Sequence, residues 1–282
     1  MPDRRTIFNS VKAATVALAV MTEKADGSCP FSIVGSGFCI DPIGIIVTCE
    51  HVLSAFMAKP LREQIASFEE VDSEKGIKSG WLAQRYVPFA IFFRMDLEPD
   101  KLVAIPTQAS ICTAKTDFDL AGIRVVPHAG FPAGFPFVEI EYYKNVCEGD
   151  EIATCGFPLG NYLHEQLGTA TSSFTTGIIS SIIPAPNAPQ KYLKGFQLNL
   201  TAAPGNSGGP VFSLTTGKVF GVLQAGPVDP KGNVVPNLTK AEPVYPVFEH
   251  DFLNQIKQMQ LPKSNADCVA LMEAVRKRAS KK

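Results

Sequence analysis

The sequence has 282 residues, of which 45% are hydrophobic and 19% are charged, with a formal net charge of −1. This ordinary globular composition argues against a disordered chain, and the near-neutral charge gives no indication of nucleic-acid binding. No apolar run is long enough to predict a membrane span. The length fits one large domain or two small ones, with enough chain for a substantial core.

The seven cysteines are an odd number, so at least one thiol stays free or pairs between molecules. There is no CxxC pair and no Cys/His cluster with zinc spacing, and we expect no structural metal and no cofactor. Residues 11–21 resemble a signal-peptide hydrophobic region, but Lys12 interrupts them and no convincing cleavage site follows. We expect a short helix leading into a core strand, and free cysteines in a reducing, cytoplasmic setting, with secretion as the open alternative.

Many short runs rich in Val, Ile and Phe, bounded by Gly, Pro or Asp, predict a β-barrel or β-sandwich. A regular βαβ alternation is absent, which disfavours a doubly wound parallel sheet. Residues 41–44 and 215–218 have the composition of tight hairpin turns. The predicted strands are 15–21, 37–40, 45–48, 86–93, 102–106, 120–126, 151–155, 175–183, 195–200, 210–214 and 219–224.

Apolar residues recur at helical spacing in residues 60–70 and 249–260. Ser264 or Asn265 is a suitable cap for one more helix near the end of the chain. The Pro-rich residues 127–136 are typical of a linker between two halves.

The strongest local signal for chemistry is the segment 203–210, in which Ser207 lies among Gly205, Asn206 and Gly208. Glycines permit a tight turn and a close approach of a substrate backbone. Such a turn can aim the N–H groups of Gly205 and Ser207 at one point, as an oxyanion hole requires. A plain Gly/Ser turn is the alternative interpretation.

A serine nucleophile needs a base, and the four histidines are at positions 51, 128, 164 and 250. His51 ends an apolar strand, which is a rigid mount for an imidazole, whereas the others lie in loops or near a helix start. The base needs an orienting carboxylate, and Asp117 and Asp119 both lie just before a predicted strand. Asp119 is the better candidate because apolar residues follow it directly, so it can be buried against the imidazole.

The chain order His51, Asp119, Ser207 resembles that of the trypsin/chymotrypsin-like serine proteases. The resemblance is strongest to the bacterial high-temperature-requirement (HtrA/Deg) branch. It implies an all-β fold of two six-stranded β-barrels with a C-terminal helix. The implied domains are 1–130, an N-terminal barrel; 131–260, a C-terminal barrel and helix; and 261–282, a helical, basic tail. Four segments carry the resemblance: 35–52, 116–121, 156–160 with 176–180, and 203–210.

The resemblance implies a serine endopeptidase that cleaves proteins or peptides through an acyl-enzyme intermediate. Ser207 would attack the scissile carbonyl, His51 would take and return its proton, and Asp119 would orient His51. The backbone N–H groups of Gly205 and Ser207, with Asn206 between them, would hold the oxyanion.

The same resemblance places Thr201 near the base of the S1 pocket, and Gln224, Ala225 and Gly226 in its wall. No acidic residue occurs at the base, which disfavours basic P1 residues. A small or medium apolar P1 residue is the resulting hypothesis.

The sequence departs from the family pattern in three ways. Asn206 stands where digestive relatives have the Asp that pairs with a freed N-terminal amine, so we do not expect that activation switch. Val52 follows His51 where those relatives have a disulfide-bonded Cys, which agrees with a reducing compartment. Only a helical tail is expected after residue 250, so regulation through a PDZ domain is not expected.

The alternative function is a catalytically silent or latent trypsin-fold module that binds a peptide or a regulatory partner, and a third is an esterase. The intact His51, Asp119 and Ser207 favour the peptidase, and the GxSxG elbow of α/β-hydrolases is absent. A homo-oligomer or a regulatory partner stays open, although the charged region 60–80 and the basic tail 276–282 are more typical of solvated surface. We interpret Cys49 as a small buried filler.

Overall fold

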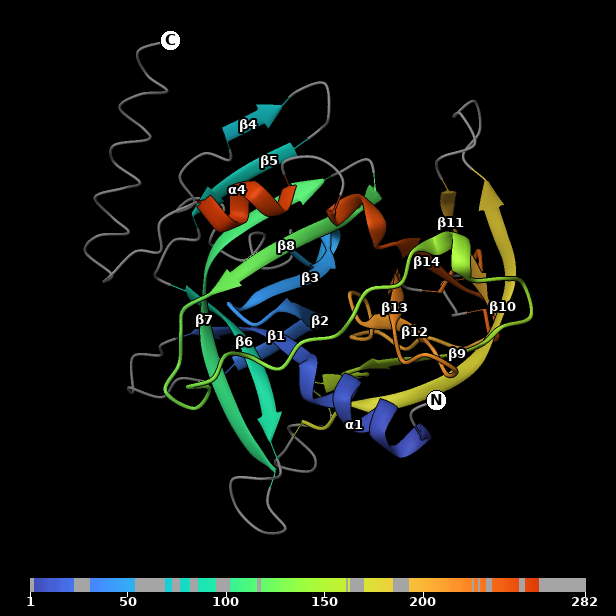
Figure 1. The fold of residues 1–282 in the computed structure, drawn as a ribbon, viewed down its shortest axis with the longest axis horizontal. Helices are drawn as coiled ribbons and strands as arrows, with labels where there is room; N and C mark the ends of the chain where they lie inside the picture. The colour runs from blue at the N-terminus through green and yellow to red at the C-terminus, as the bar shows by residue number, and fades with distance from the viewer. Residues whose placement is uncertain are drawn as a thin grey trace.

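The computed structural model describes residues 3–22, 31–53, 69–72, 77–81, 86–94, 102–115, 118–160, 162, 170–184, 193–224, 226–227, 229–231, 235–248 and 252–258. Figure 1 shows two β-rich halves side by side, with the N-terminal half in blue to green and the C-terminal half in yellow to orange.

The N-terminal half is an antiparallel sheet in the order β4-β5-β7-β6-β1-β2-β3-β8. An additional pairing between β7 and β8 closes six of these strands into a ring, from which β4 and β5 extend. Closure leaves the ring without a free edge. The strands of the N-terminal half are β1 Thr15–Thr22, β2 Phe31–Asp41, β3 Ile45–Cys49, β4 Glu69–Asp72, β5 Ile77–Trp81, β6 Tyr86–Arg94, β7 Val103–Lys115 and β8 Leu120–Val125.

The C-terminal half is a closed barrel in the order β10-β11-β14-β13-β12-β9. All of its pairings are antiparallel. Together the two halves confirm the predicted all-β fold of two barrels. The strands are β9 Glu151–Gly156, β10 Ser173–Pro184, β11 Leu193–Leu198, β12 Pro210–Ser213, β13 Val219–Leu223 and β14 Thr239–Pro243.

Helix α1 (Arg4–Ala14) runs directly into β1, as the sequence predicts. Asp3 caps it by accepting a hydrogen bond from the Thr6 N–H at 2.9 Å. Phe8 stacks edge-on against Phe174 of the C-terminal barrel, with ring centroids 4.5 Å apart. The buried face of α1 contacts the N-terminal half as well, so the helix packs against both barrels.

The expected C-terminal helix is α4 (Phe252–Gln258), which follows the short turns η3 (Tyr143–Asn145) and η4 (Tyr245–Val247). It packs on β7 and β8, and Arg124 of β8 donates to the carbonyls of Ile256 at 3.4 Å and Lys257 at 3.2 Å. Such a guanidinium satisfies carbonyls that a helix C-terminus leaves unpaired. Among the described residues, no helix has the length and hydropathy of a membrane span.

The helix predicted over 60–70 is wrong at its end, because Glu69 and Glu70 lie in β4 and pair with Ser79 and Lys78 of β5. Strand pairing overrides the helical spacing there, because β5 pairs with the edge of β7 and β4 pairs with β5. Residues 60–68, and the helix expected after position 264, lie outside the described residues.

One apolar cluster runs through both barrels and fixes their relative position. It includes Phe38 and Val47 from the first half and Phe212 and Val222 from the second, all completely buried. The end of β3 therefore meets β13, where the Cys49 thiol donates to the Leu223 carbonyl at 3.3 Å. This meeting point holds the candidate site.

Candidate active site

Strand register brings His51 and Asp119 together. β3 pairs with β8 in antiparallel fashion, and Cys49 lies opposite Leu120. His51 follows two residues after Cys49 in a helical turn, and Asp119 immediately precedes Leu120, so both lie at the same edge of the sheet. Asp119 has a φ of 46°, a left-handed conformation that costs a non-glycine residue energy and occurs often at functional sites.

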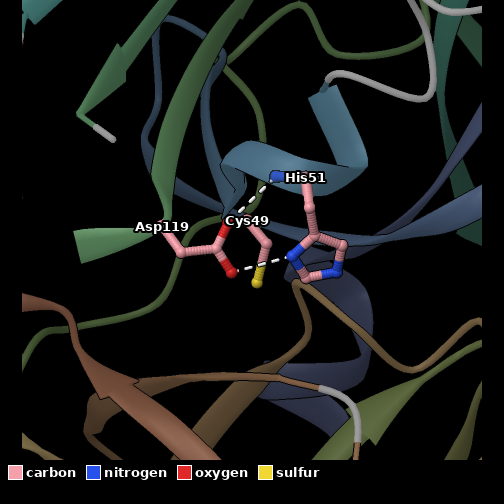
Figure 2. A group of neighbouring side chains, drawn as sticks. All are labelled: Cys49, His51 and Asp119. Atoms are coloured by element: carbon pink, nitrogen blue, oxygen red, sulfur yellow. Dashed lines mark hydrogen bonds and ion pairs between the residues drawn. The ribbon is translucent and has the colours of Figure 1, made fainter. Parts of the chain in front are cut away.

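The Asp119 carboxylate holds His51 at two points, as Figure 2 shows. One oxygen accepts the His51 backbone N–H at 2.9 Å, and the other lies 2.7 Å from Nδ1 of the ring. Because an ionised carboxylate only accepts hydrogen bonds, the proton is on Nδ1 and the lone pair is on Nε2. The His51 side chain is 48% exposed, so the ring is accessible from solvent.

Gln224, directly after β13, gives Asp119 a third hydrogen bond. Its Nε2 donates to Oδ2 of Asp119 at 2.8 Å. The sequence predicts Gln224 in the S1 wall, and no sequence signal indicates that its amide binds the Asp119 carboxylate.

These contacts shift both pKa values in the direction that general-base chemistry needs. The hydrogen bond from His51 to Asp119 raises the pKa of the imidazole above its ordinary 6.5, against the opposing effect of burial. Burial raises the pKa of Asp119, but the hydrogen bonds from His51 and Gln224 outweigh it and leave the value below 3.8. Asp119 is therefore ionised at neutral pH and stabilises the imidazolium form of His51.

Ser207 lies between two glycines with left-handed backbones, Gly205 at φ 96° and Gly208 at φ 86°. A Cβ on Gly208 would lie only 2.1 Å from the Ser36 carbonyl and 2.2 Å from the Thr48 hydroxyl, so only glycine fits at position 208. Tight turns from 203 to 206 and from 206 to 209 are each closed by a backbone hydrogen bond. The predicted tight turn at Ser207 is thus present.

Ser36 on β2 fastens this turn to the first barrel. Its hydroxyl donates to the Gly205 carbonyl at 2.6 Å and accepts the Phe157 N–H at 3.0 Å. Its backbone N–H donates to the Ser207 carbonyl at 2.8 Å. In the sequence, Ser36 is recognisable only as part of a motif, because these partners are more than a hundred residues away.

The Ser207 turn lies against the segment that carries His51. A Cβ on Gly35 would be 2.7 Å from the Val52 side chain and 3.2 Å from the Ser207 carbonyl. Gly35 therefore lies in space between Val52, which follows His51, and Ser207. Among the described residues, the hydrogen bonds of the His51 ring do not include one with the Ser207 hydroxyl. The pairing of base and nucleophile stays a prediction.

The residues predicted to form the S1 pocket differ in how exposed they are. Thr201 is exposed, and its hydroxyl accepts the Asn237 N–H at 3.0 Å. Gly226 is half-buried, whereas Ala225 lies outside the described residues. Asn206, in the predicted oxyanion loop, is buried and its Oδ1 has no hydrogen-bond partner among the described residues.

Of the other candidate bases and acids, only His128 lies among the described residues, and it does not join this group. His128 is exposed and its Nδ1 accepts the Gly130 N–H at 3.0 Å, which is a local turn contact. His164, His250 and Asp117 lie outside the described residues. Cys49 does join it: its sulfur, a His51 ring nitrogen and an Asp119 oxygen all lie within 4.8 Å of one another, the only such metal-ligating group among the described residues.

A pair of antiparallel barrels with a His–Asp pair and a Gly-Asn-Ser-Gly turn where they meet defines the class of trypsin-like peptidases. Residues 35–222 match the trypsin-like peptidase domain family, which is more than half of the chain. The chain therefore belongs to the trypsin-like peptidase family.

Solved structures of HtrA-type proteases share this fold. The HtrA-type protease AlgW, in a structure with a decapeptide, is 15% identical with a TM-score of 0.58, over 91% of this chain and 68% of that one. Deg5 is 18% identical with a TM-score of 0.56, over 89% of this chain and 95% of that one. No curated protein matches the sequence. The predicted similarity to the HtrA/Deg branch is confirmed at the level of the fold.

Proposed function

We propose that this protein is a serine endopeptidase that cleaves peptide bonds through His51, Asp119 and Ser207 with an acyl-enzyme intermediate. The observation that carries the proposal is the 2.7 Å hydrogen bond between His51 Nδ1 and Asp119 Oδ2. It fixes the tautomer in which Nε2 accepts a proton. Membership of the trypsin-like peptidase family supports the same conclusion.

Each side chain has one role in the proposed reaction. The Ser207 hydroxyl oxygen attacks the scissile carbonyl carbon while its proton passes to His51 Nε2. The resulting imidazolium, stabilised by Asp119, gives that proton to the leaving amine as the C–N bond breaks. A water molecule then hydrolyses the acyl-enzyme with His51 acting again as the base.

The N–H groups of Gly205 and Ser207 are the proposed oxyanion donors, with Asn206 between them. Neither N–H donates to an acceptor within the described residues, and the turn that carries both is held by Ser36. In known acyl-transfer enzymes, one such donor contributes about 3–4 kcal/mol to the stability of the transition state.

A peptide or protein is the proposed substrate, with a small or medium apolar P1 residue in a pocket formed by Thr201, Gln224, Ala225 and Gly226. The AlgW structures with a decapeptide and a tripeptide support a peptide substrate. Profiling with a peptide library tests the P1 preference, and cleavage mainly after Lys or Arg would contradict it.

A fluorophosphonate probe tests the nucleophile directly, because it modifies only a serine that has an active base. We expect labelling of the wild-type chain and none of Ser207→Ala. Ser180→Ala, an exposed serine on β10, is the matched control and should label fully. If the wild-type chain stays unlabelled with and without added peptide, the silent binding module is the better assignment.

A further inference from the structure

Cys49 lies beside the His51–Asp119 pair, and the proposed mechanism gives it no role. Its Sγ, a His51 ring nitrogen and an Asp119 carboxylate oxygen lie within 4.8 Å of one another, and the ring nitrogen that faces the carboxylate is Nδ1. Figure 2 shows the sulfur next to both the carboxylate and the imidazole ring. Cys49 is completely buried, whereas the side chains of its two neighbours are 48% and 24% exposed, so an ion would enter past the ring.

These three atoms are the ligand types that Zn²⁺ prefers: thiolate, imidazole and carboxylate. With metal–ligand bonds of about 2.0–2.3 Å, neighbouring ligands of a tetrahedral ion are roughly 3.4–3.6 Å apart. The His51–Asp119 distance of 2.7 Å must lengthen by about 0.7 Å to reach this spacing. Three protein ligands leave a fourth position for water on the exposed side.

The charges around Cys49 also suit a divalent cation. The Asp119 carboxylate lies within 4.8 Å of the Cys49 sulfur and brings negative charge to the group. Lys240 pairs with Glu242, so its charge is already compensated. A Zn²⁺ ion supplies the positive charge that a thiolate at position 49 lacks, and the thiolate and the Asp119 carboxylate together neutralise the ion.

We propose that Zn²⁺ binds to Cys49 Sγ, His51 Nδ1 and the Asp119 carboxylate, and thereby switches off the peptidase activity proposed above, on which the inhibitory half of this inference rests. On binding, the Cys49 thiol releases its proton to solvent. The neutral His51 ring keeps one proton, which moves from Nδ1 to Nε2. Nε2 then has no lone pair with which to accept the Ser207 proton.

The metal site is tested in the Ser207→Ala full-length chain, so that the result does not depend on activity. Calorimetric titration of the metal-free protein with ZnCl₂ should give one ion per chain. Repeating it in buffers of different ionisation enthalpy should show about one proton released. Co²⁺ should add a thiolate-to-metal absorption band, and the ¹⁵N signals of His51 should show the proton moving to Nε2.

Substitutions of Cys49 decide whether the sulfur is a ligand. Cys49→Ala and Cys49→Ser should both remove the Co²⁺ band and weaken Zn²⁺ binding by more than about 100-fold, since loss of an outer-sphere partner alone costs up to roughly that factor. The serine variant keeps the volume and can still donate to Leu223. Cys147→Ser, at an exposed position, is the matched control and should bind as the parent does. Zn²⁺ binding that is unchanged in both Cys49 variants would overturn the site.

The inhibition is tested in the chain with Ser207 intact. Zn²⁺ should abolish fluorophosphonate labelling of the wild-type chain, a chelator should restore it, and Cys49→Ala should keep its labelling at the same Zn²⁺ concentration. Labelling that persists when the site is saturated would refute the inhibitory role. A wild-type chain that never labels refutes the proposed function instead, and the titration, the Co²⁺ band and the ¹⁵N signals still decide the metal site.

Discussion

Removal of the Ser36 hydroxyl should weaken both the fold and the proposed oxyanion hole. Ser36 is completely buried, and Ser36→Ala leaves the Phe157 N–H and the Gly205 carbonyl without their partner. A buried unsatisfied group costs about 1–3 kcal/mol. The Phe157 contact is fully buried and the Gly205 contact only partly, so we expect the free energy of unfolding to fall by about 2–4 kcal/mol.

The activity should fall for a separate reason. Gly205 loses the bond that fixes its peptide, so its N–H is held less firmly at the oxyanion position. Complete loss of one such donor costs roughly 10²–10³ in rate, and looser placement should cost about 10- to 100-fold.

Two measurements check this prediction: urea unfolding in the Ser207→Ala background, which prevents self-cleavage, and the rate of fluorophosphonate labelling with Ser207 intact. Thr107→Val is the matched control, because the Thr107 hydroxyl is buried and donates to the Ala90 carbonyl at 2.7 Å within the first barrel. The control should lose about 1 kcal/mol and keep its labelling rate. A Ser36→Ala chain with wild-type stability and wild-type labelling would refute the reasoning.

Three further predictions concern the same region. Asp119→Asn should lower kcat by about 10⁴-fold. Because Asp119 holds the pKa of His51 above 6.5, the acid limb of the plot of kcat/KM against pH should also move to lower pH. An acid limb that does not move would contradict this effect on the pKa of His51. Gly208→Ala should slow fluorophosphonate labelling by about 100-fold, because the added Cβ would collide with the Ser36 carbonyl beside the Ser207 turn. Gly149→Ala is the control and should label normally, because Gly149 has a similar φ of 90° and a Cβ there would meet nothing within 4 Å. In alkylation of the folded chain followed by peptide mass spectrometry, Cys147 should react first among the four cysteines whose side chains the structure describes, since burial raises the pKa of the Cys39 and Cys155 thiols to about 12 and about 11. Modification of one of the buried thiols before Cys147 would count against the packing.

Local sequence determined most of the strands, because short apolar runs rich in β-branched residues and bounded by turn residues favour strands over helices. The runs that became β3 and β8 were predicted almost to the residue, and the turn at 41–44 was predicted from its composition. Residue types in order also identified His51, Asp119 and Ser207 as candidates, since the chemistry of acyl transfer restricts which side chains serve as nucleophile, base and orienter.

Tertiary structure decided the elements with weak local signals. β14 contains Lys240, Glu242 and Pro243, and is a strand because it fills the gap between β11 and β13 and closes the barrel. β4 contains Glu69 and Glu70, whose helical spacing was overridden by pairing with β5.

The side chains that contact the site could not be predicted from local sequence either. The amide of Gln224 reaches Asp119 across 105 positions of the chain, and the hydroxyl of Ser36 reaches Gly205 across 169. Cys49 lies beside His51 and Asp119 only because β3 and β8 pair in one register. A sequence fixes which groups are present, but the register between distant strands decides which groups meet, because a shift of one residue turns each side chain to the opposite face.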